Sequence, residues 1–126
     1  MSSDFPFSTA RSSLLNTETF RNLLGNALEN STKSVIILSA YVKTVGVNWL
    51  KEKISDKKIN CTIVTRWNNG DLAQGSSDLE CYHLAKTNGW SFKVLQDLHA
   101  KVMLVDNEIL FIGSPNLTGR GMSLVP

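Results

Sequence analysis

No apolar run in this sequence is long enough to cross a membrane. The longest apolar stretches, residues 34–42 and 102–105 among them, are far shorter than the roughly 20 residues of a transmembrane helix. The first residues also lack the basic flank and apolar block of a secretory signal peptide. These two absences favour a cytoplasmic protein that does not associate with a membrane.

Cysteine and net charge are also scarce. Cys61 and Cys81 have neither CxxC spacing nor a ligand cluster around them, so we expect reduced structural thiols rather than a disulfide or a metal site. The formal net charge of +2 is nearly neutral and neither requires nor excludes an anionic partner. Binding to nucleic acid would therefore depend on a local basic patch.

What is present is the composition of one globular domain. The chain has 126 residues, of which 42% are hydrophobic and 19% charged, a balance too apolar for a disordered protein. It contains no internal repeat and no low-complexity segment. We expect a single domain over residues 1–126.

Apolar residues at helical spacing alternate with β-branched apolar runs along the chain. The pattern predicts helices over 16–31, 47–56 and 76–89, and strands over 33–43, 60–66, 90–95, 99–105 and 108–114. Residues 67–78 are expected to form a loop, with Ser77 or Asp78 capping the third helix. The Val and Ile content of 33–43 predicts a strand covered on both faces. This order indicates an α/β sandwich, a mixed β-sheet flanked by helices, whose final hairpin is antiparallel.

The final hairpin carries polar residues at regular positions. His99 and Lys101 lie two residues apart, so their side chains would share one face of a strand. With Asp106-Asn107 as a two-residue turn, Lys101 would pair with Ile112 and His99 with Ser114. The hydroxyl of Ser114 is therefore expected beside the imidazole.

Asn116 would leave the second strand on the side of Ser114. An imidazole, an ammonium, a hydroxyl and a carboxamide would then meet at the strand ends and could hold a tetrahedral anion such as phosphate. Each group also has an ordinary explanation: a core or edge histidine, a lysine that reaches solvent, and a Gly-Ser-Pro-Asn turn. Their joint spacing favours a site.

These residues carry a resemblance. His99-x-Lys101, Asp106 and the group Gly113-Ser114 with Asn116 resemble the HxK(x4)D(x6)GSxxN signature of the phospholipase D superfamily. More widely, residues 65–86 and 113–121 resemble its nuclease branch, which includes metal-independent restriction endonucleases. The resemblance implies a phosphodiester hydrolase that cleaves nucleic acid, DNA more than RNA, as the catalytic part of a restriction or defence enzyme. It implies no cofactor and no metal.

The resemblance also implies roles for single residues. His99 would attack phosphorus and form a phosphohistidine, and a second histidine would protonate the leaving oxygen. Lys101 and Asn116 would hold the nonbridging oxygens, and Ser114 would orient the groups around the phosphate. Asp106, at the turn, is better interpreted as a structural residue that anchors the hairpin than as a direct catalyst.

The second histidine is not supplied by a second motif. His83 falls in a predicted helix without HxK context, and we expect it to be a surface or interface residue. The resemblance therefore implies a homodimer with one composite active site. Family members usually continue beyond the motif with another strand and an acidic residue, whereas no acidic residue follows Glu108 here. We therefore expect a domain truncated at its carboxyl-terminal end.

Basic and aromatic residues follow several predicted strands and could form a substrate-binding rim that takes phosphates and stacks bases. They are Tyr41, Lys43, Arg66, Trp67 and Arg120. The alternative is an ordinary scatter of surface charge, with Trp67 packed in a loop.

Two other functions stay open at this point. One is a noncatalytic DNA-binding or dimerisation module of the same fold. The other is a lipid phosphodiesterase, which the lack of an amphipathic basic segment disfavours.

Overall fold

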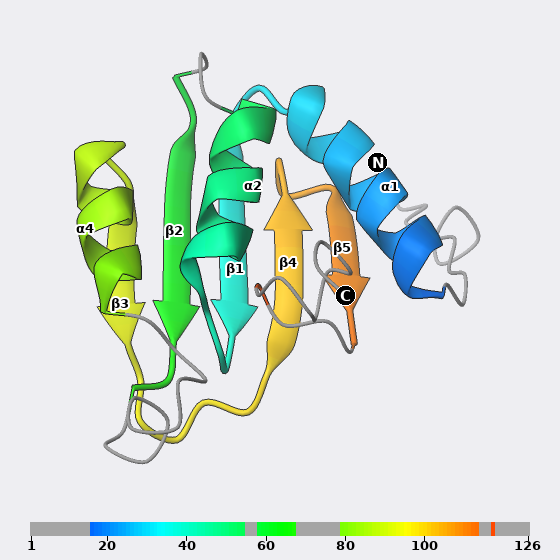
Figure 1. The fold of residues 1–126 in the computed structure, drawn as a ribbon. Coiled ribbons are helices and arrows are strands. Elements are labelled where there is room, and N and C mark those ends of the chain that lie inside the picture. The colour runs from blue at the N-terminus through cyan, green and yellow to red at the C-terminus, as the bar shows by residue number, and fades with distance from the viewer. Residues whose placement is uncertain (1–15, 55–57, 68–78, 114–116, 118–126) are drawn as a thin grey trace, which may run out of the picture.

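The order of helices and strands is the one that the sequence pattern predicts (Figure 1). The computed structural model describes residues 16–54, 58–67, 79–113 and 117. The elements are α1 (Thr17–Glu29), β1 (Ser34–Ser39), α2 (Thr44–Ile54), β2 (Asn60–Thr65), α4 (Glu80–Thr87), β3 (Ser91–Val94), β4 (Lys101–Val105) and β5 (Ile109–Ile112). Most of the predicted loop 67–78 and both predicted caps of α4, Ser77 and Asp78, lie outside the described residues.

The strands form one mixed sheet in the order β3-β2-β1-β4-β5. β1 runs parallel to β2, and β2 runs parallel to β3. β4 is antiparallel to both of its neighbours, β1 and β5. The chain is therefore an α/β protein with a mixed sheet and an antiparallel final hairpin. The carboxyl ends of β1, β2 and β3 meet the start of β4 and the end of β5 at one edge, which we call the site edge.

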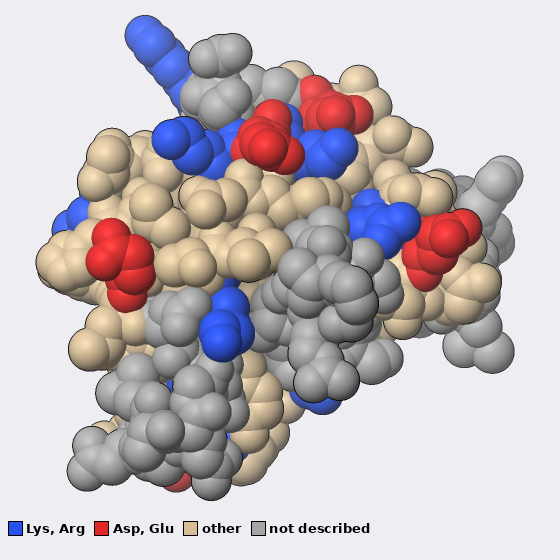
Figure 2. Space-filling view, in the orientation of Figure 1, with Lys and Arg blue, Asp and Glu red and all other residues tan. Residues whose placement is uncertain are grey.

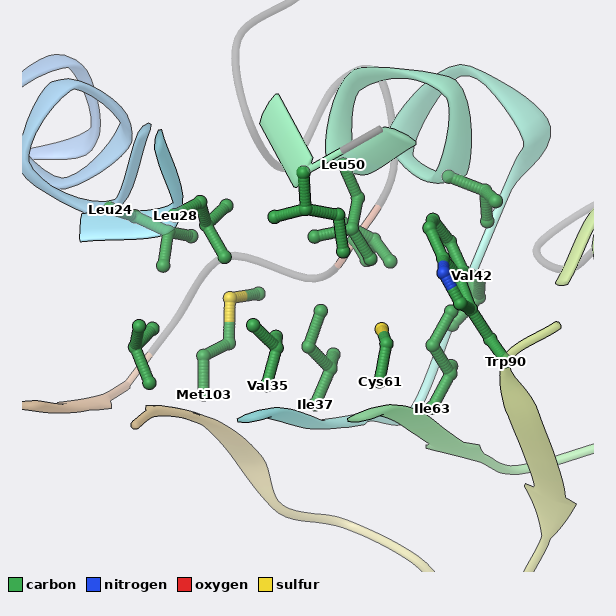
Figure 3. Close-up of a cluster of buried hydrophobic side chains, with 14 of the residues drawn as sticks. Leu24, Leu28, Val35, Ile37, Val42, Leu50, Cys61, Ile63, Trp90 and Met103 are labelled. Atoms are coloured by element: carbon green, nitrogen blue, oxygen red, sulfur yellow. The ribbon is translucent and has the colours of Figure 1, made fainter. Parts of the chain in front are cut away.

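The three described helices lie against the same face of the sheet, and the core fills the space between them (Figures 1 and 3). Figure 3 shows leucines of α1 and α2 above a row of residues from the strands. The largest fully buried side chains are Leu24, Leu28, Ile37, Leu50, Ile63, Met103, Leu117, Val35, Val42, Val47 and Val105. Removal of this apolar surface from water is the main force that holds the helices on the sheet.

The burial of β1 and β2 differs from the prediction. Residues of β1 alternate strictly between half-buried and buried, and those of β2 do so after an exposed first residue. Val35 and Ile37 face the helices, whereas Ile36 and Leu38 are half-buried on the other face. The expectation of a strand covered on both faces is thus wrong for the described part of the molecule, because its helices all pack on one side.

The register of the β4–β5 hairpin is shifted by one residue from the predicted one. Val102 pairs with Ile112 and Val105 with Ile109. Lys101 is opposite Gly113, whose N–H donates to the Lys101 carbonyl at 3.0 Å. The predicted pairing of Lys101 with Ile112 is therefore wrong, and the predicted partner of His99 lies outside the described residues.

One extra residue after the turn explains this shift. Asp106 and Asn107 have φ angles of 55° and 58°, and the Glu108 N–H donates to the Val105 carbonyl at 3.0 Å, as in a two-residue type I′ turn. The predicted turn is therefore present. Glu108 adds one residue between this turn and the first ladder pair, which moves every later residue of β5 by one position.

The helix ends follow local signals. The Asn16 side chain accepts a hydrogen bond from the Thr19 N–H at 2.8 Å and caps α1. Gly89 ends α4 with a φ angle of 75°, a conformation that favours glycine. α2 begins at Thr44, three residues before the predicted start at Val47.

Both cysteines, Cys61 and Cys81, are buried and free. Burial raises the pKa of the Cys61 thiol to about 12, so this sulfur stays protonated at neutral pH. Among the described residues, no helix combines the length and apolarity needed to span a bilayer.

Candidate active site

His99 and Lys101 lie at the site edge of the sheet. His99 is exposed in the segment that leads into β4, and Lys101 is the half-buried first residue of that strand. Lys101 pairs with Ser39 across the β1–β4 ladder. Because paired residues project from the same face of a sheet, and Ser39 is buried, the lysine points to the helix-covered face.

Leu117, which follows β5 in the chain, is tied to the same place in the sheet. The Leu117 N–H donates to Ser39 Oγ at 2.9 Å, and the Leu117 carbonyl accepts from the Lys43 N–H at 3.0 Å. Leu117 also forms a parallel bridge with Val42. Ser114 and Asn116, two of the predicted site residues, lie outside the described residues.

The spacing between those two residues departs from the signature. One residue, Pro115, separates Ser114 from Asn116, whereas the signature as written has two residues there. The agreement in spacing is therefore complete only from His99 to Ser114. Asn116 is the one asparagine within three residues of Ser114 in the sequence. We therefore match it to the asparagine of the signature by residue type and not by spacing.

Two buried hydroxyls at the site edge were missed by the reasoning from sequence. Ser39 Oγ donates to the Tyr41 carbonyl at 2.7 Å, and Thr65 Oγ1 donates to the Ala40 carbonyl at 3.2 Å. Ser39 and Thr65 are direct partners in the β1–β2 ladder, and both are fully buried. Their signal in the sequence is a hydroxyl residue that ends each of two apolar runs.

Tyr41 and Arg66, predicted to belong to a substrate-binding rim, are in contact. Arg66 Nη2 donates to the Tyr41 hydroxyl at 2.6 Å, and the guanidinium carbon lies 4.9 Å from the centroid of the tyrosine ring. The Arg66 N–H donates to the Ala40 carbonyl at 3.3 Å, which joins the two strand ends. The structure thus places a cation and an aromatic ring together just beyond the site edge.

Trp67 is predicted either to join the substrate-binding rim or to pack in a loop. Its ring is half-buried, with its centroid 5.2 Å from that of Phe92 in β3. The indole nitrogen Nε1 is buried and has no hydrogen-bond partner among the residues that the structure describes. The loop-packing alternative therefore describes this residue better. Lys43 is half-buried between β1 and α2, and Arg120 lies outside the described residues.

Asp106 lies at the other end of β4, remote from the site edge. Its carboxylate accepts hydrogen bonds from three successive backbone N–H groups, those of Thr32, Lys33 and Ser34, at distances from 2.8 to 3.2 Å. Desolvation acts to raise the pKa of Asp106. The three backbone N–H groups and the Lys33 charge outweigh it and hold the pKa below its ordinary value. This geometry agrees with an anchor of the hairpin.

His83 stands apart from His99. It is exposed on α4, and its ring centroid lies 5.6 Å from that of Tyr82. In the sheet order, β2 and β1 separate β3, beside which α4 packs, from β4 (Figure 1). The described structure therefore does not bring the two histidines of the chain together.

The charged surface is mixed. In the view of Figure 2, blue Lys and Arg side chains alternate with red Asp and Glu side chains across the described surface. No group of three or more His, Cys, Asp or Glu that could hold a metal ion occurs within residues 16–54, 58–67, 79–113 and 117. Lys101 is the positively charged residue of the motif that the structure describes near His99. Its ammonium could therefore neutralise the charge of a phosphate bound at this edge.

Several solved structures share this fold. NucT from Helicobacter pylori aligns with a TM-score of 0.63 and 17% identity over 84% of this chain and 72% of NucT. Nuc from Salmonella typhimurium, a phospholipase D family member, aligns with a TM-score of 0.63 and 19% identity over 80% of this chain and 66% of Nuc. TrmBL2, an archaeal chromatin protein with a novel mode of DNA binding, aligns with a TM-score of 0.57 and 12% identity over 83% of this chain and 42% of TrmBL2.

A comparison with protein families reaches further than the fold. No curated protein sequence matches the chain. The family described as "Cardiolipin synthase, PLD-like domain" matches residues 24–125, which include His99, Lys101 and Asp106. Together with the motif at the site edge, this match shows that the chain belongs to the phospholipase D superfamily.

Proposed function

We propose that this domain is a metal-independent phosphodiesterase that cleaves nucleic acid, DNA more readily than RNA, as the catalytic part of a restriction or defence enzyme. The observation that carries the proposal is the pair of His99 and Lys101 at the site edge. An exposed imidazole precedes a half-buried ammonium by two residues, at the place where α/β folds commonly bind ligands.

Lys101 supplies the fixed charge of the site. Its pairing with the buried Ser39 anchors the backbone, and its position on the helix-covered face directs the ammonium toward one side of the edge. A positive charge held there favours a transition state in which negative charge grows on the nonbridging phosphate oxygens. In this proposal the carboxamide of Asn116 and the hydroxyl of Ser114 complete the hydrogen bonds to those oxygens.

The reaction has two displacement steps. An imidazole nitrogen of His99 attacks phosphorus and forms an N–P bond, while the P–O bond to the leaving oxygen breaks. A second histidine gives its proton to that oxygen. In the second step a water oxygen bonds to phosphorus, the N–P bond breaks and the water proton returns to the second histidine.

The second histidine comes from another copy of the chain. The sequence has two histidines, and His83 is exposed on α4, away from the β4 end of the sheet. The partner subunit's His99 would supply the acid, so that one composite site lies on the two-fold axis of a homodimer. This arrangement requires a dimer in solution, which light scattering measures directly.

Nucleic acid is the preferred substrate because of the residues beside the site edge. Arg66 and Tyr41 form a cation–aromatic pair there, and such pairs bind both phosphates and bases. The solved structures of the same fold include NucT and Nuc, and their names support the proposal of a nuclease.

The test is cleavage of plasmid DNA by the purified protein in excess EDTA. We expect cleavage by the wild type and by His83→Ala, and none by His99→Ala. The His83 variant is the matched control, because it removes the other imidazole of the chain from an exposed helix position. Equal cleavage by His99→Ala and the wild type would overturn the mechanism.

A second function is a noncatalytic DNA-binding module. The shared fold of TrmBL2 is the observation that favours it. Binding of DNA in a gel-shift assay, with no hydrolysis of DNA or of bis-p-nitrophenyl phosphate, would select this function. Hydrolysis of phospholipid vesicles without cleavage of DNA would instead select a lipid phosphodiesterase.

A further inference from the structure

One row of paired residues crosses the sheet at the site edge. Lys101 in β4 is opposite Ser39 in β1, and Ser39 is in turn opposite Thr65 in β2. Neighbouring strands lie about 4.8 Å apart, so the row places the backbone of Thr65 roughly 10 Å from that of Lys101. Arg66 directly follows Thr65. The guanidinium and the ammonium therefore belong to residues that lie two strands apart along the same edge.

Two hydrogen bonds fix the backbone at Arg66. The Ala40 carbonyl accepts from Thr65 Oγ1 at 3.2 Å and from the Arg66 N–H at 3.3 Å. Thr65 is fully buried, and its own carbonyl accepts from the Leu95 N–H at 2.8 Å. Residues that follow β1 and β3 thus hold the end of β2 from both sides.

Tyr41 holds the side chain of Arg66. Arg66 Nη2 donates to the Tyr41 hydroxyl at 2.6 Å, and the guanidinium carbon lies 4.9 Å from the ring centroid. The Tyr41 carbonyl accepts from the buried Ser39 Oγ at 2.7 Å. Both side chains of the pair are half-buried. A guanidinium ordered before a ligand arrives loses less conformational entropy on binding, and partial desolvation strengthens its attraction to an anion.

We propose that Arg66, held by Tyr41, binds a second phosphate of the nucleic-acid strand that is cleaved. A strand of a duplex carries one phosphate per roughly 3.4 Å of helix axis, so a separation of about 10 Å corresponds to two or three nucleotides. The planar fork of the guanidinium matches phosphate oxygens better than an ammonium does.

The substrate is then a strand with consecutive phosphates, and an isolated phosphodiester lacks the group that Arg66 binds. Arg66 acts in this inference on binding and register, while His99 and Lys101 act on the cleaved bond. The inference rests on the proposed function, because it requires the cleaved phosphate to lie at His99 and Lys101.

Lys58 provides the control for a general effect of charge. It is exposed and precedes β2, which begins at Asn60, whereas Arg66 follows the same strand. Lys58→Ala and Arg66→Ala therefore each remove one positive charge, from opposite ends of one strand. Only Arg66→Ala changes the charge at the site edge.

The first experiment compares kcat/KM for a thymidine dinucleotide, which contains a single phosphodiester, with kcat/KM for a pentanucleotide, which contains several. The gain of the longer substrate over the shorter one measures the contribution of phosphates outside the cleaved bond. We expect this gain to fall about 10-fold or more in Arg66→Ala, the usual effect of a lost hydrogen bond to a charged group. The gain should stay at the wild-type value in Lys58→Ala.

Conservative variants separate the guanidinium from the group that holds it. Arg66→Lys keeps the charge but not the planar fork, so it should recover part of the gain. Tyr41→Phe removes the hydroxyl that accepts from Arg66 and should lower the gain less than Arg66→Ala does. If Arg66→Ala does not fold, Arg66→Gln decides the same comparison, since it removes the charge and keeps a donor for the Tyr41 hydroxyl.

Binding without turnover gives an independent measurement. The affinity for a fluorescently labelled oligothymidylate is measured by anisotropy at several salt concentrations, in chains that all carry His99→Ala. Each phosphate contact with a single strand contributes about 0.7 to the slope of log Kd against log salt concentration. We expect Arg66→Ala to lower this slope by about 0.7 and Lys58→Ala to leave it unchanged. An unchanged slope in Arg66→Ala would overturn the inference.

The outcomes also separate this inference from the proposed function. Cleavage with an equal gain in the wild type and Arg66→Ala would support the function and reject the inference. A fall in kcat/KM by the same factor for both substrates would reject it too, because Arg66 would then act on the cleaved phosphate or on the fold. A wild type that hydrolyses neither substrate would reject the function, and the salt dependence of binding would still decide whether Arg66 holds a phosphate.

Discussion

Asp106 Oδ1 accepts a hydrogen bond from the Lys33 N–H at 2.8 Å, which joins the β4–β5 turn to the start of β1. The Asp106 N–H in turn donates to the Ser34 carbonyl at 2.7 Å. One residue thus extends the β1–β4 ladder beyond its last pair. The motif aspartate is a structural link at one end of β4, whereas Lys101 begins the other end at the candidate active site.

Replacement of the half-buried Asp106 should therefore reduce stability more than replacement of an exposed aspartate. Asp106→Ala removes the acceptor of three backbone N–H groups, and we expect the free energy of unfolding to fall by about 1–3 kcal/mol. Asp97→Ala, which removes an exposed aspartate, should change it little. Urea denaturation compares the two, and equal losses would contradict the anchoring role.

The lowered pKa of Asp106 makes a prediction for acid stability. The folded state favours the charged carboxylate, so the unfolded state binds the proton more readily. The stabilisation is present above the ordinary carboxyl pKa of about 4, and it is lost as the pH falls through the lower folded value. The stability advantage of the wild type over Asp106→Asn should be largest at neutral pH and should shrink in acid. A difference that is constant with pH would disprove this linkage.

Both thiols should be unreactive in the folded protein. Cys61 and Cys81 are buried in the core, and the thiolate, which is the reactive form, is disfavoured at Cys61. Titration with Ellman's reagent at neutral pH should therefore find no fast-reacting thiol in native protein and two thiols after denaturation in urea. Fast reaction of the native protein would show that the core opens on the timescale of the assay.

Mixed dimers test the composite site. Wild-type and His99→Ala chains, coexpressed in equal amounts, should form dimers at random, and only the wild-type pair has both histidines. Activity per total protein should then be about one quarter of the wild-type value. Independent active chains would give about one half. A value near one half would therefore show that each chain works alone.

Much of the fold can be predicted from local patterns. The Asn16 cap, the glycine after α4 and the β-branched runs of β1 and β2 each act through neighbouring residues, so they are visible in the sequence. The His99 and Lys101 pair can be singled out as a candidate for the same reason, because its spacing within one strand segment is local. The Asp106-Asn107 turn was also predicted correctly.

Long-range pairing accounts for the differences. Glu108 shifts the β4–β5 register by one residue, and the choice between these registers depends on which face of β5 packs against the helices. The half-buried second face of β1 likewise follows from where three distant helices pack. The contact of Trp67 with Phe92 likewise comes from the placement of β3 beside β2, which neighbouring residues in the sequence do not indicate.

The sequence by itself determined the elements, their order and the motif residues, because these depend on spacing along a short stretch of chain. Only the tertiary structure decided that Ser39 and Leu117, 78 residues apart, share a hydrogen bond, and that Gly46 leaves room for it. Such contacts arise when buried polar groups must find partners in the packed molecule. No pattern along the chain encodes which partner each will meet.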